Sequence, residues 1–309
     1  MRRLLVCLAL CGRVWAVAPA WSLDVGVSEG YNHYDATDLN SVMVLLERTT
    51  REASGFNHYD VKGFDGHPAT QLFLGATRGD WRVGLEAEFW TETFQQTEVP
   101  FDAAHADRKF RVTCDEVRAQ ADSGRTGCLD AREVFRFVPI TLQASWMPRW
   151  TPWLRAGGGY GIGILAGSAD ITLSTQYYGP EASPPDRITL GVVPSPLVTW
   201  VHKFWATAEF LPWDWLGIEL RGGWRYTEMG GVKIDSRSGK SQVLDLIFNS
   251  PKEGDRLYVR NPSGTPEQTS LFIGSPQAAR AQTRYDFHQV TGDFSGWFLA
   301  LGLNAHWSL

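Results

Sequence analysis

The glycine-rich stretch GGGYGIGILAG, residues 157–167, is the first candidate for chemistry, because it holds six glycines in eleven residues. Gly161, Gly163 and Ala166 fit the G-x-G-x-x-[GA] spacing of a dinucleotide-binding loop. Such a loop needs a helix directly after its glycines, so that backbone amides and the helix dipole meet the pyrophosphate. The residues that follow, SADITLSTQYY, show no helical periodicity. We therefore predict that the stretch binds no cofactor.

Cysteine pairs are the second candidate for chemistry. Cys7 and Cys11 lie within the first twenty residues, whereas thirteen residues separate Cys114 from Cys128. That spacing is not typical of zinc ligands, and no second pair completes a site, so we predict no bound metal. In an oxidising compartment the later pair is expected to form a disulfide, which closes one loop and stabilises the fold by about 3 kcal/mol.

The first twenty residues indicate that the chain is exported. Two arginines precede the short apolar run 4–18, and the residues APA at 18–20 offer a cleavage site. We predict a cleaved signal peptide at 1–20 and a mature domain at 21–309. Cleavage removes three arginines and no acidic residue, which leaves 26 basic and 34 acidic residues, a net charge of −8. Since a nucleic-acid partner would need a basic face, this charge argues against that class of function.

Strict alternation of apolar and other residues is the main structural signal. In residues 296–309 every second residue from Trp297 to Leu309 is apolar, and the other parity is mostly small or polar. A strand of this length can cross a bilayer when it is tilted. The same pattern predicts eight strands, at 22–31, 70–77, 81–89, 138–146, 152–168, 199–211, 216–226 and 296–309.

The connections between these strands alternate in length. Short turns are expected at 77–80, 147–151 and 212–215. Long gaps are expected near 32–69, 96–133, 169–197 and 229–290. Short periplasmic turns and long extracellular loops are typical of outer-membrane barrels. We therefore predict an all-β, up-and-down antiparallel transmembrane barrel of eight strands with long extracellular loops, located in the outer membrane.

Tryptophans support this orientation, because seven of them fall at the expected periplasmic ends of strands. Amphipathic rings favour the headgroup level of a bilayer, so these residues are predicted to form a girdle. They are Trp81, Trp146, Trp150, Trp153, Trp213, Trp215 and Trp307.

Charged residues collect on the inward parity of the strands. Charges that leave water need partners, and the interior of an eight-stranded barrel is just wide enough for side chains to fill it. We predict a neutral ion-pair network that plugs the lumen, with a narrow polar path as the alternative. The charged residues are Arg82, Glu86, Glu88, Arg155, Glu209, Glu219, Arg221 and Arg225. A row of inward glycines is interpreted as room for these long side chains, and consists of Gly157, Gly159, Gly161 and Gly163.

Two segments depart from the alternating pattern. Residues 38–52 have helical spacing, with Asp38 as the expected N-cap, and should lie in the first extracellular loop. Residues 242–248 and 256–260 are expected to form a hairpin above the membrane, because both are shorter than the roughly nine residues that a spanning strand needs. If they did span the membrane, the barrel would have ten strands.

The signal peptide, the eight alternating strands and the charged lumen resemble the OmpA-, OmpX- and OmpW-type outer-membrane barrels. The resemblance extends over residues 21–309 as a pattern and includes no diagnostic motif. It implies a Gram-negative envelope, delivery by the barrel-assembly machinery, and contact with outer-membrane lipid and lipopolysaccharide. The expected role is a non-catalytic surface protein whose long loops contact an extracellular ligand. The alternative is a narrow, porin-like channel or transporter for small solutes, in the OmpW manner.

An enzymatic function is not expected. Some eight-stranded outer-membrane barrels are enzymes. Lipid A deacylases of the PagL type remove acyl chains with a His-x-Ser pair and a glutamate near the outer leaflet. His306 and Ser308 are the only His-x-Ser match in this sequence, and they fall at the opposite, periplasmic end of the last strand.

Overall fold

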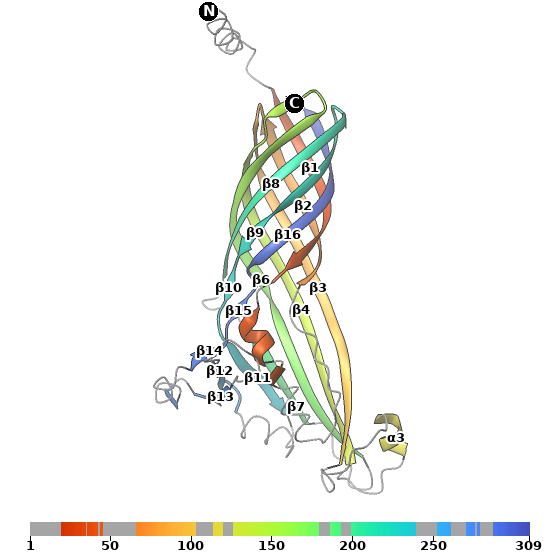
Figure 1. Cartoon of the computed structure of the whole chain (residues 1–309), viewed down its shortest axis with the longest axis vertical. Coiled ribbons are helices and arrows are strands. Elements are labelled where there is room, and N and C mark those ends of the chain that lie inside the picture. Colours follow the sequence, from red (N-terminus) through yellow and green to blue (C-terminus); the bar gives the residue numbers. More distant parts are fainter. Residues whose placement is uncertain are drawn as a thin grey trace, which may run out of the picture.

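The computed structural model describes residues 20–34, 36–42, 44–45, 66–102, 114–119, 126–178, 186–192, 199–238, 252–260, 270–275, 277–278 and 287–309. Figure 1 shows a barrel at one end of the molecule and, at the other, an elongated sheet formed by continuing strands. Two of the sequence predictions concern segments outside the described residues: nearly all of the signal peptide and the first hairpin strand, 242–248.

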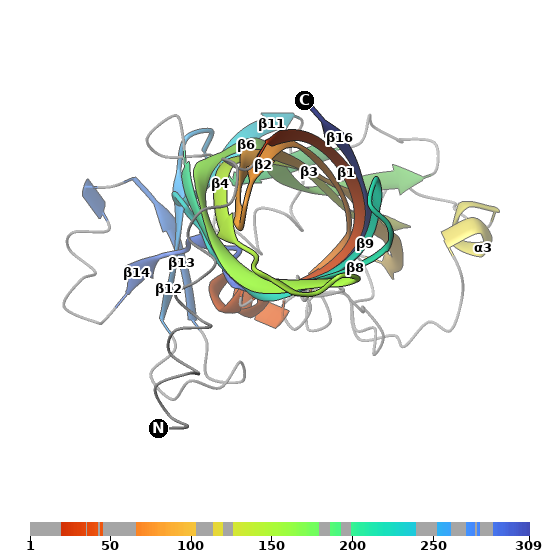
Figure 2. The ribbon, with the colours of Figure 1, turned by 90° about the horizontal axis from the view of Figure 1, so that it is seen from above.

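Eight antiparallel strands close the barrel, as the sequence predicted. They are β1 (Trp21–His33), β2 (Gly66–Arg78), β3 (Trp81–Asp102), β4 (Thr126–Trp146), β6 (Leu154–Tyr178), β8 (Thr199–Trp213), β9 (Leu216–Tyr226) and β16 (Gly296–Ser308). Each pairs with its neighbour along the chain, and the β1–β16 pairing completes the ring in Figure 2. Closure leaves the barrel wall without an exposed strand edge. The ten-stranded alternative is therefore excluded.

Each barrel strand presents one apolar face outward and one packed face inward. In β16 the outward Leu301 is 59% exposed, whereas the inward Phe298 is 2% exposed. Successive side chains of a strand point to opposite faces, so the alternation in the sequence becomes an inside and an outside. The outer surface of the barrel is therefore covered by exposed aliphatic and aromatic side chains.

The short connections lie together at one end of the barrel, called here the short-turn end. β2 and β3 are joined by residues 79–80, where Gly79 has φ = 62°, a conformation that favours glycine in a tight turn. β5 (Arg149–Thr151) lies between β4 and β6 and pairs with β6, and residues 214–215 join β8 to β9. The opposite end, called the loop end, carries the long connections.

Three barrel strands continue far beyond the loop end, and here the sequence prediction is wrong. β3, β4 and β6 cover parts of the predicted long loops 96–133 and 169–197. β7 (Asp186–Val192), β11 (Val232–Ser238), β12 (Arg256–Arg260) and β13 (Ser270–Gly274) add to the same sheet. Apolar side chains alternate in these segments too, and Ile171, Ile188 and Ile234 are almost completely buried. We call this part the extension sheet (Figure 1).

A disulfide links the segment between β3 and β4 to β4, as predicted. The short helix α3 (Cys114–Ala119) begins at Cys114, which is bonded to Cys128. The two cysteines are buried together with Tyr178, whose ring lies 5.1 Å from the guanidinium carbon of Arg118. The bond therefore fixes α3 to the tip of the extension sheet.

A helix is present near the predicted segment 38–52, at residues 37–42 and 44–45. Its apolar residues Leu39 and Val42 are buried, so it packs against the rest of the molecule. Asp38 is not the N-cap. Its carboxylate accepts hydrogen bonds from the Thr291 backbone N–H at 3.2 Å and lies 3.0 Å from His288 Nε2. Asp38 instead links the helix to the last long connection, which joins β9 to β16.

The last long connection contains several short strands. β12 coincides with the predicted strand 256–260 and pairs with β11, β13 and β14 (His288–Gln289). β10 (Glu228–Met229) pairs with β15 (Gly292–Asp293) next to the barrel rim. None of the helices in the described ranges has the length and hydropathy of a membrane-spanning helix.

Candidate functional site: the charged lumen and the polar pocket

Lys203 lies at the centre of the lumen, where three strands contribute charged side chains. Its ammonium group donates to Glu86 Oε1 at 2.5 Å and to Glu88, both on β3. From β9, Arg221 donates to Glu86, and Arg225 donates to Glu88 at 2.5 Å. All five side chains are buried. Residues two apart on a strand share a face, so two carboxylates from one strand meet three cations from two others.

Glu219 is the second centre of the network. Arg82 Nη1 donates to its carboxylate at 2.9 Å and Asn304 Nδ2 at 2.5 Å. Arg221 Nε donates to the other oxygen at 3.0 Å, so this arginine bridges the two centres. The ion pairs thus form one network that crosses the lumen between β3 on one side and β8 and β9 on the other.

His306 completes the network near the short-turn end. Its Nδ1 lies 2.8 Å from Asp24 Oδ1, and its Nε2 lies 3.1 Å from Glu209 Oε1. Asn304 Nδ2 also donates to Glu209, at 2.9 Å, and Arg82 Nε lies 3.5 Å from Asp24 Oδ2. The first and last strands of the barrel are therefore joined through polar side chains as well as through their backbones.

The structure brings seven of the eight predicted network residues into direct contact with partners. Arg155 is the exception, because it is partly exposed and its Nη1 lies 3.8 Å from Glu209 Oε2. Sequence reasoning missed Asp24, Lys203, Asn304 and His306 as members. The inward parity of 199–211 held the signal for Lys203, because Val201, Lys203, Trp205, Thr207 and Glu209 all lie on it.

Charges of opposite sign face one another in the lumen. Five carboxylates lie inside the described barrel: Asp24, Glu86, Glu88, Glu209 and Glu219. Five side chains that carry a permanent positive charge face them: Arg82, Arg155, Lys203, Arg221 and Arg225. His306 lies between two of the carboxylates, those of Asp24 and Glu209. Burying unpaired charges costs several kcal/mol per ion, so a mutually paired set is the form in which a narrow lumen tolerates them.

Aromatic side chains close the lumen at the loop end. Trp90 is completely buried and lies 6.1 Å from Phe137 and 5.6 Å from Tyr34, between ring centroids. Phe294 packs against Phe137 at 5.1 Å. The guanidinium carbon of Arg225 lies 4.3 Å from the Trp90 ring centroid, a cation–π distance that joins this cluster to the charges below it. We call these rings the aromatic cap.

The glycine row has a different neighbour from the one predicted. A Cβ atom at Gly159 would lie 2.6 Å from Trp205 Cε2, and one at Gly161 would lie 3.4 Å from Trp205 Cζ3. At Gly157 and Gly163 a Cβ would meet backbone carbonyls of β4. The space above the row therefore holds an indole ring, not arginines and glutamates. The guanidinium carbon of Arg221 lies over that ring, 5.2 Å from its centroid.

Little empty space remains among these side chains. The cavity found inside the described lumen has a volume of about 10 Å³, and Ser28, Phe73, Glu86 and Asn304 are among its lining residues. This is room for about one water molecule. The charged network, the Trp205 indole and the aromatic cap together fill the barrel.

Aromatic residues form two belts on the outer surface. All seven predicted tryptophans are exposed and lie at the short-turn end, where Trp21 joins them. A second belt at the loop end was not predicted and contains Tyr31, Phe89, Trp200, Trp224, Tyr226 and Trp297. Mainly aliphatic side chains cover the surface between the belts, with Tyr160, Phe204 and Phe210 as further exposed rings. Glu29 is the one carboxylate among the described outward residues of this band, and it accepts a hydrogen bond from Thr70 Oγ1 at 2.7 Å.

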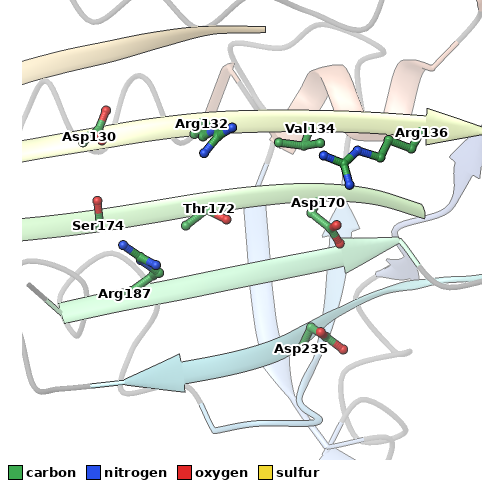
Figure 3. A pocket seen from close by; sticks show the side chains of 9 residues that line it. All are labelled: Asp130, Arg132, Val134, Arg136, Asp170, Thr172, Ser174, Arg187 and Asp235. Atoms are coloured by element: carbon green, nitrogen blue, oxygen red, sulfur yellow. The ribbon is translucent and has the colours of Figure 1, made fainter. Parts of the chain in front are cut away.

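A wide hollow lies on the extension sheet. It has a volume of about 480 Å³ and is shown in Figure 3. Its lining side chains come from four neighbouring strands and are Asp130, Arg132, Val134, Arg136, Asp170, Thr172, Ser174, Arg187 and Asp235. We call it the polar pocket. Sequence reasoning missed it because most of these residues fell in predicted loops.

The three arginines of the polar pocket are available for a ligand. Strand pairing places Arg132 opposite Thr172 and Arg187 opposite Ser174, so two guanidinium groups approach hydroxyl-bearing positions of β6. Within the described residues, neither these two arginines nor Arg136 forms an ion pair or a side-chain hydrogen bond. The described part of the chain contains no cluster of three potential metal-ligating side chains.

Comparisons with known proteins give no family assignment. No protein-family model matches the chain, and a comparison with curated proteins found no match. Any functional statement therefore has to be argued from the geometry of the barrel, the extension sheet and the polar pocket.

Proposed function

We propose that the chain is an outer-membrane β-barrel protein of a Gram-negative bacterium. The observation that carries the proposal is the pair of aromatic belts separated by an aliphatic band. On β16 the belts are marked by Trp297 and Trp307, ten residues apart. At about 3.3 Å per residue and a tilt of about 40°, this separation spans about 25 Å, the height of the apolar band of such barrels.

The proposed role is non-catalytic and belongs to the loop end, which would face the outside of the cell. The described lumen is crossed by buried side chains that form ion pairs with one another, so it offers little space for a substrate. The extension sheet, in contrast, carries an open pocket and the long connections. Binding residues are commonly placed on segments that a rigid scaffold holds out. The role is therefore an interaction at the cell surface, with outer-membrane lipid, lipopolysaccharide or an extracellular ligand.

The alternative, a narrow channel for small solutes, has less support. A channel needs a continuous path, and the described lumen holds a network of buried ion pairs below an aromatic cap. Opening it would break contacts such as those of Lys203 with Glu86 and Glu88, which leaves buried charges without partners. Breaking one such pair costs on the order of 3–5 kcal/mol.

Cell fractionation tests the proposal. The full chain is expressed in a Gram-negative host, and its membranes are separated on a sucrose gradient. The protein should sediment with outer-membrane markers, need detergent for extraction, and migrate differently on a gel before and after boiling. Recovery of the mature protein in the soluble fraction without detergent would contradict the proposal.

A further inference from the structure

The polar pocket lies on the same face as the apolar outer surface of the barrel. On β4 the outward residues include Leu142, Ile140 and Val138, and the same parity continues through Arg136 to Arg132. On β6 the outward Ile164 is followed by Asp170 and Thr172, while Leu165, Ile171 and Leu173 of the other parity are buried. Unbroken pairing of β4 with β6 keeps the two strands in register over this distance. The outward face of β4 and β6 is thus apolar along the barrel and charged along the extension sheet.

The change occurs at the height of the lipid headgroups, if the barrel spans a membrane as proposed. Arg136 is two residues beyond Val138, which is about 7 Å along the strand. The polar layer on each side of the hydrocarbon core is about 5–8 Å thick. Arg132 lies four residues farther along β4, so the pocket extends past a single phosphate layer. A ligand that fills it has to be larger than a simple headgroup.

The chemistry of the lining fits a phosphate attached to a sugar. Guanidinium groups bind phosphate oxygens with paired, charge-assisted hydrogen bonds, and the three pocket arginines have no carboxylate partner within the described residues. The aspartates that line the pocket, among them Asp170 and Asp235, accept hydrogen bonds and so suit the hydroxyl groups of a sugar. Three arginines and three aspartates give no net charge, so a bare anion gains little from long-range attraction.

We propose that the polar pocket binds the phosphorylated sugar headgroup of an outer-leaflet glycolipid, whose acyl chains lie against the apolar surface of β4 and β6. The proposal rests on the membrane orientation given above. It assigns the phosphate to Arg132, Arg136 and Arg187 and the sugar hydroxyls to the carboxylates. The extension sheet then binds one glycolipid next to the barrel wall.

Native mass spectrometry of the detergent-solubilised full chain tests this assignment. Two probes are compared, bis-phosphorylated lipid A and the same lipid after enzymatic removal of its phosphates. The wild-type protein should retain one phosphorylated lipid, and it should bind the dephosphorylated lipid at least about tenfold more weakly. Replacing Arg132, Arg136 and Arg187 with glutamine should weaken binding of the phosphorylated lipid by a similar factor.

A matched control carries the same change of charge elsewhere. Arg78→Gln, Arg118→Gln and Arg149→Gln remove three exposed arginines outside the pocket, and this variant should bind the phosphorylated lipid like the wild type. Equal binding by the pocket variant, or equal binding of the dephosphorylated lipid, would overturn the inference. Inorganic phosphate that binds as tightly as the lipid would overturn the lipid assignment in favour of a free anion. Because binding is measured in detergent, its failure is distinct from failure of the protein to fractionate with the outer membrane.

Discussion

Lys203 Nζ and Glu86 Oε1 lie 2.5 Å apart in the middle of the barrel, and neither side chain is more than 1% exposed. The two residues are 117 positions apart in the sequence, on strands that are not neighbours in the barrel wall. The contact therefore crosses the lumen and ties opposite walls together. The stability of the interior therefore depends on charges of opposite sign that different strands contribute.

Removing that lysine should destabilise the barrel. Lys203→Met leaves Glu86 and Glu88 with one cation fewer, and the expected loss is about 3–5 kcal/mol in the free energy of unfolding. Urea unfolding in lipid vesicles, followed by tryptophan fluorescence, measures it. Lys233→Met, which removes an exposed partner of Asp235, should change stability by less than about 0.5 kcal/mol. Combining Lys203→Met with Glu88→Gln should restore part of the loss, and equal losses for all three variants would refute the charge-balance explanation.

A charge on the outer band should cost stability according to its depth. Leu142 is 60% exposed and pairs with the apolar Leu85 and Ile162, so an introduced arginine finds no partner there. Leu142→Arg should destabilise the protein in vesicles by about 2–4 kcal/mol, whereas Trp146→Arg in the belt should cost about 0–1 kcal/mol. The two variants are compared by the same unfolding assay. Equal effects would argue that the band does not face hydrocarbon.

Filling the glycine row should strain the lumen. A methyl group at Gly159 would lie 2.6 Å from Trp205 Cε2 and 2.8 Å from Ser145 Cβ, so Gly159→Ala should destabilise by about 1–3 kcal/mol. Gly222→Ala is the control, because its Cβ would lie 3.4 Å from Leu299 Cδ1. If Trp205 is the obstacle, the added substitution Trp205→Leu should make Gly159→Ala less harmful. If Gly159→Ala costs the same stability with Trp205 and with Trp205→Leu, the strain does not arise from the contact with Trp205.

The purified wild-type protein should not conduct ions. The lumen cavity lined by Ser28, Phe73, Glu86 and Asn304 has a volume of about 10 Å³, and the buried ion pairs and the aromatic cap lie across the described lumen. Planar-bilayer recordings should show no steady current steps above those of protein-free detergent controls. Reproducible, ohmic channel openings would favour the channel alternative and would mean that the cap and the ion pairs separate in the membrane.

The barrel could be predicted from the sequence because alternation determines both the number of strands and their two faces. The same alternation assigns a residue to the inside without saying which strand lies opposite it. For this reason Glu86 was predicted to face inward, but its partner Lys203 was not recognised. Trp205 shows the limit in another way: its parity placed it inside, while its position against Gly159 depends on the stagger between β6 and β8.

The extension sheet could not be predicted by the same reasoning. Beyond the apolar band the outward residues are polar. Strands such as β4 therefore no longer show there the pattern of apolar outward and polar inward residues that predicted the barrel. Residues 132–137 read REVFRF, with a charged residue on each parity, and were left outside the predicted strands. The polar pocket depends on Arg132, Arg136 and Arg187, which come together only because β7 pairs with the continuation of β6.

The contact between Asp24 and His306 sets a condition on how the molecule can form. These side chains are 282 positions apart, and they belong to the first and last strands of the barrel. Asp24 cannot meet this partner, nor can Glu209, until β16 has been synthesised. The last strand to be made therefore completes both the closure of the barrel and the contacts of these two carboxylates. A copy truncated before β16 would lack both.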